Sequence, residues 1–550
     1  MVRKRENVNT HLEKLPSAGK YSMKNIPIPT ESQYMKKLIA QMEKVVKNIR
    51  WKALFYLKED EIYKEIVEKI ECHGKEEKYG FKSVRKPYAI KEMEDFEKEL
   101  YGMAKNVEFI KDIKLDEFQK EMREDLSEMS KLDKVIVSAD KSRNFYTCDI
   151  PEYKNMINQN ITKEYKKSTQ EAVNDNDIKS GEIAVKLKLD DRMQKYSNKE
   201  CFVTVKDLKE NFINRPECRL ISPAKNELGR VVKIKLEEIN REIRYTTGVN
   251  QWQSTQKVID WFKYIKNPEE YEFLKFDIVK FYPSIKPELL NNAIKFARSV
   301  KGIVIPKADE EMILHCRRSF LFWEKQPWTK IGPENFDVPM GSYDGAEICE
   351  LVGLYILHKL TSGKDPIFEK ENCGIYRDDC LAIINLNGSR RIAENDINKK
   401  LREIFGSKNL KITIDPLTPV TNYLDVILNL ERHVHEPYRK PTNDPVYINV
   451  NSDHPKHVIK HIPTMIEQRL STLSSTENIF DTHKAPYEEA LKNSGYIYRP
   501  IKDEKDPRKI KKAVNLKYQK PKKSKRKRKP RKIIYFNPPF SKSVKTNVIK

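Results

Sequence analysis

Apolar positions in the first part of the chain recur with the period of an α-helix. The spacing is carried by five residues on one helical face: Leu38, Met42, Val45, Val46 and Ile49. The stretch IRWKALFYLKEDEIYKEIVEKI, which begins at Ile49, keeps the same character, and charged residues fill the positions between the apolar ones. The pattern predicts an N-terminal helical extension over residues 1–130.

Near residue 131 the pattern changes to short apolar runs typical of strands, mixed with helical segments. The stretch RLISPAKNELGRVVKIKLEEINREI predicts a strand, a turn and a helix, and YEFLKFDIVKFYPSI predicts a strand that ends in a turn at Pro283. Beyond about residue 431, Pro-bounded segments such as NDPVYINVNSDHPKHVIKHIPTMIEQRLSTLSS and APYEEALKNSGY predict a helical lobe. We therefore expect an α+β fold, with strands concentrated in residues 131–430 and helices in residues 431–500.

The charge balance favours a polyanionic partner. The chain has 550 residues, of which 105 are basic and 81 acidic, for a net charge of +24. Nucleic acid is the first candidate partner, and an anionic membrane surface is the second. The run KPKKSKRKRKPRK, Lys520 to Lys532, is a nuclear localisation signal, an RNA-binding arm or a solvated linker. We expect the basic tail, 501–550, to be disordered.

The remaining composition narrows the class of protein. No apolar run approaches the roughly 20 residues that a bilayer span needs, and the N-terminus lacks the apolar stretch of a signal peptide. The eight cysteines are scattered singly, with no CxxC pair that would suggest a zinc finger or a redox site. These features predict a soluble intracellular protein with reduced thiols and no membrane partner.

Acidic residues interrupt two apolar runs. In CGIYRDDCLAII, apolar residues on both sides predict a β-hairpin whose tight turn carries Asp378 and Asp379. Aspartates are also common in turns simply because they cap backbone N–H groups. In FLKFDIVKFYPSI, however, Asp277 stands among large apolar residues, where an unpaired carboxylate costs several kcal/mol or becomes protonated. A Mg²⁺ ion bound by all three carboxylates would remove that cost.

Four segments in order, FDIVKFYPSI, VPMGSYDGAEICELVG, GIYRDDCLAI and NYLDVILNL, resemble the palm motifs of a reverse transcriptase of the Penelope-like retroelement family. Upstream, VSADKSRNFY and CRLISPAKNELG resemble its finger motifs. Downstream, SDHPKHVIKHIPTMIEQRLSTLSS and YEEALKNSGY resemble its thumb. The similarity covers residues 130 to 500. It implies a right-hand polymerase, with fingers and palm in residues 131–430 and a helical thumb in residues 431–500.

The resemblance also implies a catalytic centre. Asp277 and Asp378 would bind two Mg²⁺ ions, or Mn²⁺, and Asp379 would be a looser ligand or a neighbour of the ligands. Tyr282 would be the aromatic gate that excludes a ribose 2′-hydroxyl, although an ordinary core aromatic has the same pattern. Met340, Gly341 and Ser342 would form the loop that lets substrate approach the backbone. A helix N-terminus capped by Ser342 or Asp344 is compatible with this loop.

Further residues match the family's nucleotide and primer contacts. Lys141 and Arg219 would neutralise the triphosphate, unless they are solvated charges at strand edges. Lys411 lies where the family carries a lysine that protonates pyrophosphate. Leu424 and Asp425 would belong to the primer grip, for which a core strand is the alternative.

Two departures from the family pattern concern this centre. Arg377 replaces a small or apolar residue, and it either pairs with primer phosphate or Asp379, or crowds the turn and slows catalysis. Tyr343 and Asp344 replace a Pro-containing sequence, which leaves substrate clearance at the loop open. Neither departure removes a predicted metal ligand.

The absence of nuclease and integrase motifs bears on how the expected polymerase would be primed. No GIY-YIG endonuclease, ribonuclease H or integrase signature is evident, so we expect a truncated or nuclease-lacking copy primed by an existing DNA end. Three histidines near one another are expected to belong to thumb helices rather than to a zinc site, because no cysteine is nearby: His454, His457 and His461.

We therefore expect an RNA-directed DNA polymerase of a retroelement, acting on an RNA template, a DNA primer or target end, and deoxynucleoside triphosphates. The alternatives are a catalytically inactive nucleic-acid-binding relic and an RNA-dependent RNA polymerase, and Tyr282 argues against the second. Residues 1–130 are expected to bind template RNA. The basic tail predicts a nuclear location, with the cytoplasm, together with element RNA, as the alternative.

Overall fold

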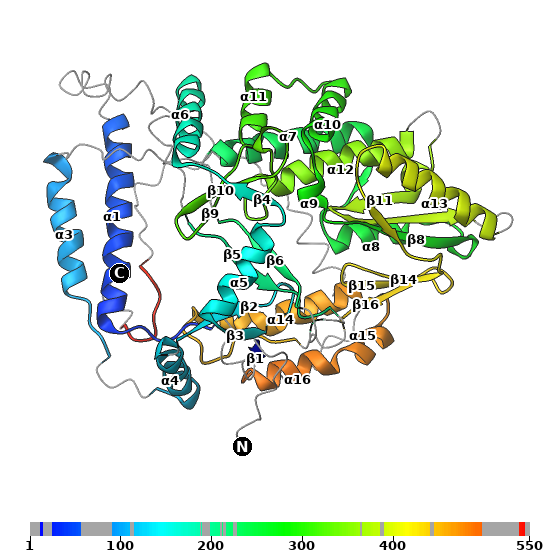
Figure 1. The fold of residues 1–550 in the computed structure, drawn as a ribbon. Coiled ribbons are helices and arrows are strands. Elements are labelled where there is room, and N and C mark those ends of the chain that lie inside the picture. Colours follow the sequence, from blue (N-terminus) through cyan, green and yellow to red (C-terminus); the bar gives the residue numbers. More distant parts are fainter. Residues whose placement is uncertain are drawn as a thin grey trace.

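The computed structural model combines helices and strands, which confirms the α+β class (Figure 1). It describes most of residues 25–497 and two short terminal segments. The described ranges are 12–14, 25–56, 91–110, 115–131, 133–142, 144–187, 189, 199–209, 212, 216–223, 228–362, 366–385, 390–440, 445–497 and 538–544. Within these ranges, no helix is both long and apolar enough to cross a bilayer.

A five-stranded sheet in the order β13-β8-β12-β11-β7 lies at the centre of the site-bearing region. Its strands are β7 (Asn250–Gln251), β8 (Tyr271–Ile278), β11 (Cys373–Tyr376), β12 (Asp379–Asn385) and β13 (Ile412–Ile414). All neighbours are antiparallel except β7 and β11. Strand β8 buries Phe273 on one face of the sheet and Leu274 and Phe276 on the other, so both faces of the sheet are covered.

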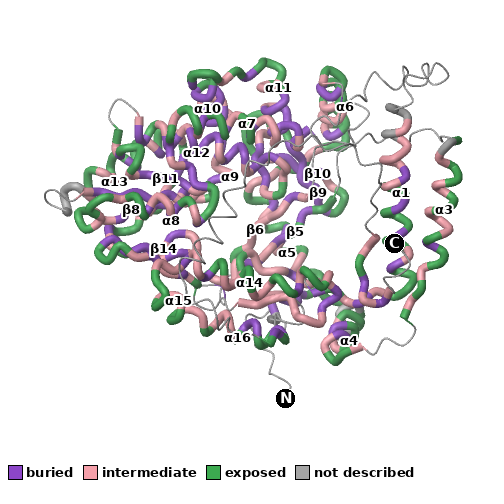
Figure 2. Tube along the Cα trace, turned by 180° about the vertical axis from the view of Figure 1, so that it is seen from behind, coloured by how far each residue is buried: buried purple, intermediate pink, exposed green. Residues whose placement is uncertain are grey.

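One face of the sheet packs against a helical layer that contains the main hydrophobic core. The helices that contribute are α7 (Leu228–Thr247), α10 (Pro287–Ser299), α11 (Lys307–His315), α12 (Gly345–Ser362) and α13 (Arg390–Gly406). Helix α12 is apolar almost all round, and Figure 2 shows it deep inside the molecule. A helix of this character is stable only when surrounded by protein.

The other face carries a second core, built by α8 (Thr255–Lys263) and a three-stranded sheet. The strands of that sheet are β14 (Val420–Tyr423), β15 (Val426–Asn429) and β16 (Val434–Pro437). Phe273 and Leu381 from the central sheet pack there with Phe262 of α8 and Leu428 of β15. The segment NYLDVILNL is therefore a hairpin, as expected from the sequence.

Short strands and helices precede the central sheet in the chain, and two further short strands, β9 (Leu321–Trp323) and β10 (Gln326–Lys330), lie between β8 and β11 in sequence. Three small sheets contain β1 (Glu13–Lys14), β2 (Lys134–Ser138), β3 (Phe145–Asp149), β4 (Tyr165–Lys167), β5 (Phe202–Val205), β6 (Cys218–Ile221), β9 and β10. Helices α5 (Ile150–Ile161) and α6 (Gln170–Lys186) lie between them in sequence. The expected strand, turn and helix of RLISPAKNELGRVVKIKLEEINREI correspond to β6 and α7.

The predicted turn at Pro283 differs from the structure. Strand β8 ends at Ile278, the chain turns at Val279 and Lys280, and Pro283 lies inside the one-turn helix α9 (Phe281–Ser284). Lys280 has a left-handed backbone, with φ 51°. Proline is compatible with the first turn of a helix, so Pro283 does not mark the end of the strand.

The described N-terminal part is mainly helical, as the periodicity predicts, and it also contains the short strand β1. It contains α1 (Glu31–Tyr56), α3 (Glu94–Lys105) and α4 (Glu117–Lys131), together with the 3₁₀ turn η3 (Lys91–Met93). Leu38 and Met42 are buried against Ala104 of α3. The remainder of IRWKALFYLKEDEIYKEIVEKI after Tyr56 lies outside the described residues.

Beyond β16 the chain forms α14 (Lys456–Leu473), α15 (Glu477–His483) and α16 (Ala485–Asn493), as the helical lobe predicts. The loop before α14 contacts segments far away in the chain. The Ile26 backbone N–H donates to Ser452 Oγ at 2.7 Å, and the Lys542 backbone N–H donates to Asp453 Oδ1 at 2.8 Å. Residues 538–544 therefore pack in place, which differs from the disorder expected of the tail. The basic run 520–532 lies outside the described residues.

Candidate active site

Two paired strands bring the predicted acidic residues together. Asp277 near the end of β8 lies directly opposite Asp379 at the start of β12, so their side chains leave the same face of the sheet. The Ile278 N–H donates to the Asp378 carbonyl oxygen at 3.1 Å, which holds the hairpin turn against the end of β8. Residues about one hundred positions apart in sequence thus meet at one edge of the fold.

The hairpin is present, but the prediction of its turn residues is wrong by one position. Tyr376 pairs with Asp379, so the two turn residues are Arg377 and Asp378, and Asp379 already belongs to β12. Pairing with β8 extends the ladder to Asp379, and this tertiary contact overrides the local turn preference of aspartate. Asp379 consequently faces Asp277 more directly than the resemblance suggested.

Like charges and burial both act on these carboxyls. Burial, followed by the negative charges of Asp378 and Asp379, raises the pKa of Asp277 to about 6. Burial and the charge of Asp378 likewise raise the pKa of Asp379. The positive charge of Lys141 opposes both shifts without cancelling them. The cluster is therefore short of positive charge, which is the condition that a cation would relieve.

The donor chemistry of the cluster fits a divalent cation. Carboxylate oxygens at the ends of two neighbouring strands are the ligands that Mg²⁺ prefers. Within the described part of the chain, no three His, Cys, Asp or Glu side chains already stand in the arrangement of a metal site. The carboxylates would have to turn toward a bound ion. The same observation gives no support for zinc at His454, and His457 and His461 lie on α14.

Tyr282 borders the acidic cluster from α9. Its half-buried ring packs against the main core and comes close to Gly345, the first residue of α12, where an added Cβ would lie 3.6 Å from Cε1. Burial raises the pKa of its hydroxyl, and the charge of Asp378 contributes to that shift. Tyr282 thus has a core contact and a position beside the acids, which is compatible with both of its predicted roles.

The Met340–Ser342 loop is tied to the strand that carries Arg219. The Ser222 N–H, directly after β6, donates to the Met340 carbonyl oxygen at 3.0 Å. Gly341 has φ 113°, and a Cβ added there would collide with the Ser222 carbonyl oxygen. Only glycine fits this close approach. Ser342 Oγ is buried and has no hydrogen-bond partner within the described residues.

Tyr343 and Asp344, the two residues after Ser342 that depart from the expected pattern, have side chains that point away from the loop. Asp344 is buried and forms an ion pair with the fully buried Arg317, so its carboxylate does not cap α12. The Tyr343 ring lies under the guanidinium of Arg230 on α7, with the guanidinium carbon 5.8 Å from the ring centre. Both side chains are thus held by neighbouring helices rather than extending over the acids.

The basic finger residues lie next to each other. Arg219 on β6 pairs with Asp140 at 2.8 Å, and the adjacent Lys141 is exposed and close enough to the acids to oppose their pKa shifts. Asp207 anchors the same loop by accepting hydrogen bonds from Asn144 at 2.7 Å and Tyr146 at 3.0 Å. The structure therefore brings Lys141 to the acidic cluster and leaves Arg219 engaged with Asp140.

The residues predicted to act on pyrophosphate and primer flank the cluster from the other sides. Lys411 is exposed just before β13, and its carbonyl oxygen accepts from the Val279 N–H at 2.9 Å. Leu424 and Asp425 form the turn between β14 and β15, where Leu424 has φ 55°. Asp425 forms an ion pair with Arg469 of α14, which joins this turn to the helical lobe.

Arg377 is exposed, with φ 59° in the left-handed region. Its guanidinium carbon lies 5.9 Å from the ring centre of Tyr376. A two-residue hairpin turn commonly has glycine where φ is positive, so arginine is strained here. No described contact pairs Arg377 with Asp379, which was one of its predicted partners.

Three residues near the cluster escaped the sequence analysis. The positive charges of Lys275 and Lys440 oppose the raised pKa of Asp379, and the Tyr423 hydroxyl donates to the Asp379 carbonyl oxygen at 2.7 Å. Lys275 precedes Asp277 by two positions on one strand, so strand periodicity could have indicated it. No sequence signal indicates Lys440 or Tyr423, because only the fold brings them near.

Comparisons with known proteins give remote similarities. No protein-family model and no curated protein matches this chain. Among solved structures, telomerase from Candida albicans in complex with the TWJ fragment of telomeric RNA has TM-score 0.46 and 10% identity, covering 74% of this chain and 68% of that chain. Apo telomerase from Candida tropicalis has TM-score 0.41 and 10% identity, covering 70% and 71%. The BmCPV RNA-dependent RNA polymerase at elongation state has TM-score 0.33 and 13% identity, covering 51% and 25%. Similarity at this level carries no argument about function.

Proposed function

We propose that this chain is a template-directed nucleic-acid polymerase, and specifically an RNA-directed DNA polymerase of a Penelope-like retroelement. The observation that carries the proposal is the register of β8 and β12, which sets Asp277 opposite Asp379 with Asp378 in the adjoining turn. Burial and the charges of Asp378 and Asp379 raise the pKa of Asp277, and burial and the charge of Asp378 raise the pKa of Asp379, so the cluster serves no stabilising purpose by itself. The three carboxylates are explained by a bound divalent cation.

Divalent cations at the cluster, Mg²⁺ or Mn²⁺, would supply the stabilisation of attacking and leaving oxygens that nucleotidyl transfer requires. Asp277 and Asp378 would be the main ligands, with Asp379 beside them. The Tyr423 hydroxyl fixes the backbone at Asp379, and the Ile278 N–H fixes it at Asp378. These bonds fix the backbone of Asp379 on β12 and of Asp378 in the adjoining turn, so only the side chains would need to turn on binding.

The surroundings suit a nucleoside triphosphate on one side. Lys141 is the basic residue nearest to the cluster among the predicted nucleotide contacts, and Arg219 supports its loop through Asp140. The close contact of Gly341 with the Ser222 backbone would hold the loop beside the strand that carries Arg219. Tyr282 would lie against the sugar and reject a ribose 2′-hydroxyl. Lys411 would protonate the leaving pyrophosphate.

The opposite side suits a primer strand. The β14–β15 turn with Leu424 and Asp425 would contact the primer end, and the Asp425–Arg469 ion pair would couple that contact to α14. Arg377 would meet primer phosphate from the hairpin turn. The net charge of +24 supports a nucleic-acid partner for the chain as a whole.

Primer extension tests this proposal most cheaply. Purified protein with poly(rA) template, oligo(dT) primer, dTTP and Mg²⁺ should extend the primer, and Asp378→Asn should abolish extension. Template binding without any extension in the unmodified chain would instead support an inactive relic. Preference for UTP over dTTP would support an RNA-dependent RNA polymerase and refute the assigned role of Tyr282.

Nuclear import through the basic run 520–532 is part of the proposal and needs its own assay. The run lies outside the described residues, so it is argued from its composition alone. A reporter protein fused to residues 515–535 should accumulate in the nucleus. If the reporter stays in the cytoplasm, the result would support the alternative that the protein acts in the cytoplasm with its element RNA. The template-RNA role of residues 1–130 likewise remains a prediction.

A further inference from the structure

A groove runs beside the edge strand β7, between α7, α8 and the start of α12. Two adjoining cavities of about 630 and 650 Å³ form it, and they share Arg244, Gln251, Trp252 and Gln253 as lining residues. The first cavity reaches Arg377 in the acidic hairpin. The second extends past Trp261 and Tyr264 of the α8 region. The groove is therefore continuous from the candidate active site along one edge of the central sheet.

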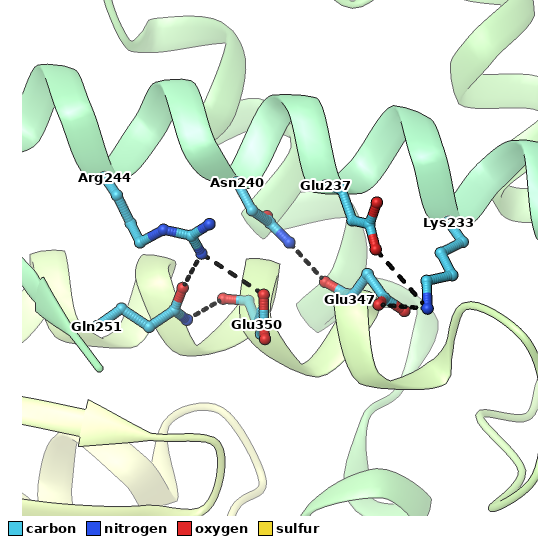
Figure 3. Close-up of polar contacts among 7 residues, drawn as sticks. All are labelled: Lys233, Glu237, Asn240, Arg244, Gln251, Glu347 and Glu350. Carbon is cyan, nitrogen blue, oxygen red and sulfur yellow. Dashed lines mark hydrogen bonds and ion pairs between the residues drawn. The ribbon is translucent and has the colours of Figure 1, made fainter. Parts of the chain in front are cut away.

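The floor of the groove is rigid and has its charges paired. Figure 3 shows Arg244 of α7, Gln251 of β7 and Glu350 of α12 joined together. Arg244 donates to Gln251 Oε1 at 2.7 Å and lies 3.5 Å from Glu350, and Gln251 donates to the Glu350 carbonyl oxygen at 2.7 Å. These polar groups bond to one another. A ligand in the groove would therefore contact the outer residues rather than the floor.

Further along α7, the acidic residues that line the groove are partly neutralised. Lys233 lies 3.7 Å from Glu237 and 3.5 Å from Glu347 (Figure 3). Asn240 donates to the Glu347 carbonyl oxygen at 2.9 Å, which ties α7 to α12. The one lysine therefore offsets part of the repulsion that these two carboxylates would exert on an anionic ligand.

The outer residues include aromatic and basic side chains, and the second cavity is also lined by the acidic Asp260 and Glu371. Tyr245 and Tyr264 line the two cavities with 87% and 84% of their surface exposed, which is unusual for rings of this size. Lys257, on the second cavity, and Arg377, on the first, are exposed and form no ion pair among the described contacts. Lys266 completes the basic rim of the second cavity.

We propose that this groove binds single-stranded nucleic acid, with bases stacked on Tyr245 and Tyr264 and phosphates held by Lys257, Lys266 and Arg377. Exposed aromatic rings set between unpaired cations are the combination that binds single strands without sequence readout. The groove opens at the acidic hairpin, so a strand held there would continue to the candidate active site. The proposal does not depend on catalysis, although continuity with the proposed polymerase site supports it.

Crosslinking and binding to the full chain test the groove. The protein is first saturated with unlabelled template–primer duplex to occupy the candidate active site, and a labelled single-stranded oligo(rA) carrying 5-bromouridine is then added. Ultraviolet crosslinks mapped by mass spectrometry should fall on peptides that contain Tyr245 or Tyr264. Crosslinks confined to other surfaces would overturn the proposal.

Variants of the tyrosines separate stacking from other effects. The double variant Tyr245→Ala, Tyr264→Ala should raise the dissociation constant for the labelled strand about 25-fold or more, since each lost stacking contact costs about fivefold or more. The double variant Tyr245→Phe, Tyr264→Phe keeps the rings and should stay within about twofold of the unmodified chain. Equal affinity of the alanine and phenylalanine variants would refute stacking.

Charge is tested against a matched pair on α10. Lys257→Ala with Lys266→Ala should weaken binding and flatten its dependence on salt, because about 0.7 counterions are released per phosphate contact in a single strand. Lys295→Ala with Lys301→Ala removes two exposed lysines away from the groove and should leave the salt slope unchanged. Equal slopes in both pairs would overturn the phosphate contacts assigned to Lys257 and Lys266.

The groove and the polymerase activity can fail separately. Asp378→Asn should lose primer extension and still bind and crosslink the single strand. Loss of extension in the unmodified chain with intact crosslinks would sink the polymerase proposal alone. Intact extension with no crosslink in the groove would sink the groove alone.

Discussion

Two charged centres about thirty residues apart in sequence use aspartate in opposite ways. In the helical layer, Asp344 is paired with Arg317, and their side chains are only 2% and 1% exposed. At the sheet edge, Asp277, Asp378 and Asp379 meet with no arginine or lysine bonded to them among the described contacts, and the pKa of Asp277 rises to about 6. The Met340–Ser342 loop lies between Arg317 and Asp344 in sequence.

The difference separates a structural charge from a functional one. A buried carboxylate paired with arginine keeps the fold specific, and removal of either partner leaves an uncompensated charge. Three carboxylates that repel one another weaken the fold, and a bound cation would relieve that repulsion. The role of an aspartate therefore depends on the positive charge that it is paired with. The following predictions test this interpretation.

The largest effect is expected from the acidic cluster. Asp277→Asn and Asp378→Asn should each lower primer extension about a thousandfold or more, because a metal ligand contributes several kcal/mol of transition-state stabilisation. The melting temperature should not fall, since each change removes a repelling charge. Asp481→Asn on the exposed surface of α15 is the control and should retain extension. A drop in stability instead of activity would make the cluster structural.

The buried pair should behave in the reverse way. Arg317→Met leaves Asp344 buried and unpaired, which should lower the free energy of unfolding by about 3 to 5 kcal/mol. Urea denaturation measures this change. The double variant Arg317→Met, Asp344→Leu should recover much of the loss, because no charge is then buried alone. Failure of the double variant to recover would mean that the pair does more than neutralise itself.

The Met340–Ser342 loop should be sensitive to the addition of a single methyl group. Gly341→Ala forces a clash with the Ser222 carbonyl oxygen in addition to backbone strain, so it should raise the KM for nucleotide and lower the melting temperature. Gly302→Ala is the matched control, because Gly302 has φ 89° but nothing within 4 Å of an added Cβ. If both variants behave alike, strain alone explains the effect and the loop's close contact does not matter.

The pH dependence of stability should reveal the repelling acids. Between about pH 4, the value of an unfolded aspartate, and about pH 6, native Asp277 holds a proton that the unfolded chain has lost. Stability without metal should therefore fall as the pH rises through this window, and Asp277→Asn should remove that component. Added Mg²⁺ should stabilise the protein increasingly above pH 6, since it binds the ionised form. A component that rises with pH in the metal-free protein would contradict the raised pKa.

The smallest effect concerns the hairpin turn. Arg377→Gly should stabilise the protein by about 1 kcal/mol, because glycine adopts the left-handed backbone without strain. If Arg377 also holds nucleic acid, the same variant should weaken template–primer binding. Thermal unfolding and a binding titration report the two effects independently, and Arg377→Lys keeps the charge as a control. A neutral Arg377→Gly in both assays would remove Arg377 from the account.

Local sequence patterns predicted the helices and strands better than they predicted the tertiary contacts between them. The periodicity of Leu38 and Met42 and the alternating run around Asp277 were sufficient to indicate α1 and β8. The hairpin was predicted, but its turn was displaced by one residue, because pairing of Asp379 with β8 is a tertiary contact. The packing of Lys542 on Asp453 and the approach of Lys440 to the acids depend on the path of the whole chain, and no local period encodes them.

The candidate site was indicated through the order of its motifs rather than through any one of them. Asp277 and Asp378 were assigned from a resemblance, and the register of β8 and β12 sets Asp277 opposite Asp379, with Asp378 in the adjoining turn. The burial of Asp344 against Arg317 was not predictable, because the partner comes from a different segment with no motif of its own. Charge partners are set by packing, which explains why two aspartates in similar sequence settings have different environments.

Anomalous diffraction from crystals soaked in Mn²⁺ and a non-hydrolysable deoxynucleoside triphosphate tests the central claim most directly. The account predicts Mn²⁺ between the carboxylates of Asp277 and Asp378, with two ions about 4 Å apart once the nucleotide is bound. Mn²⁺ bound elsewhere, with these carboxylates unligated, would contradict it.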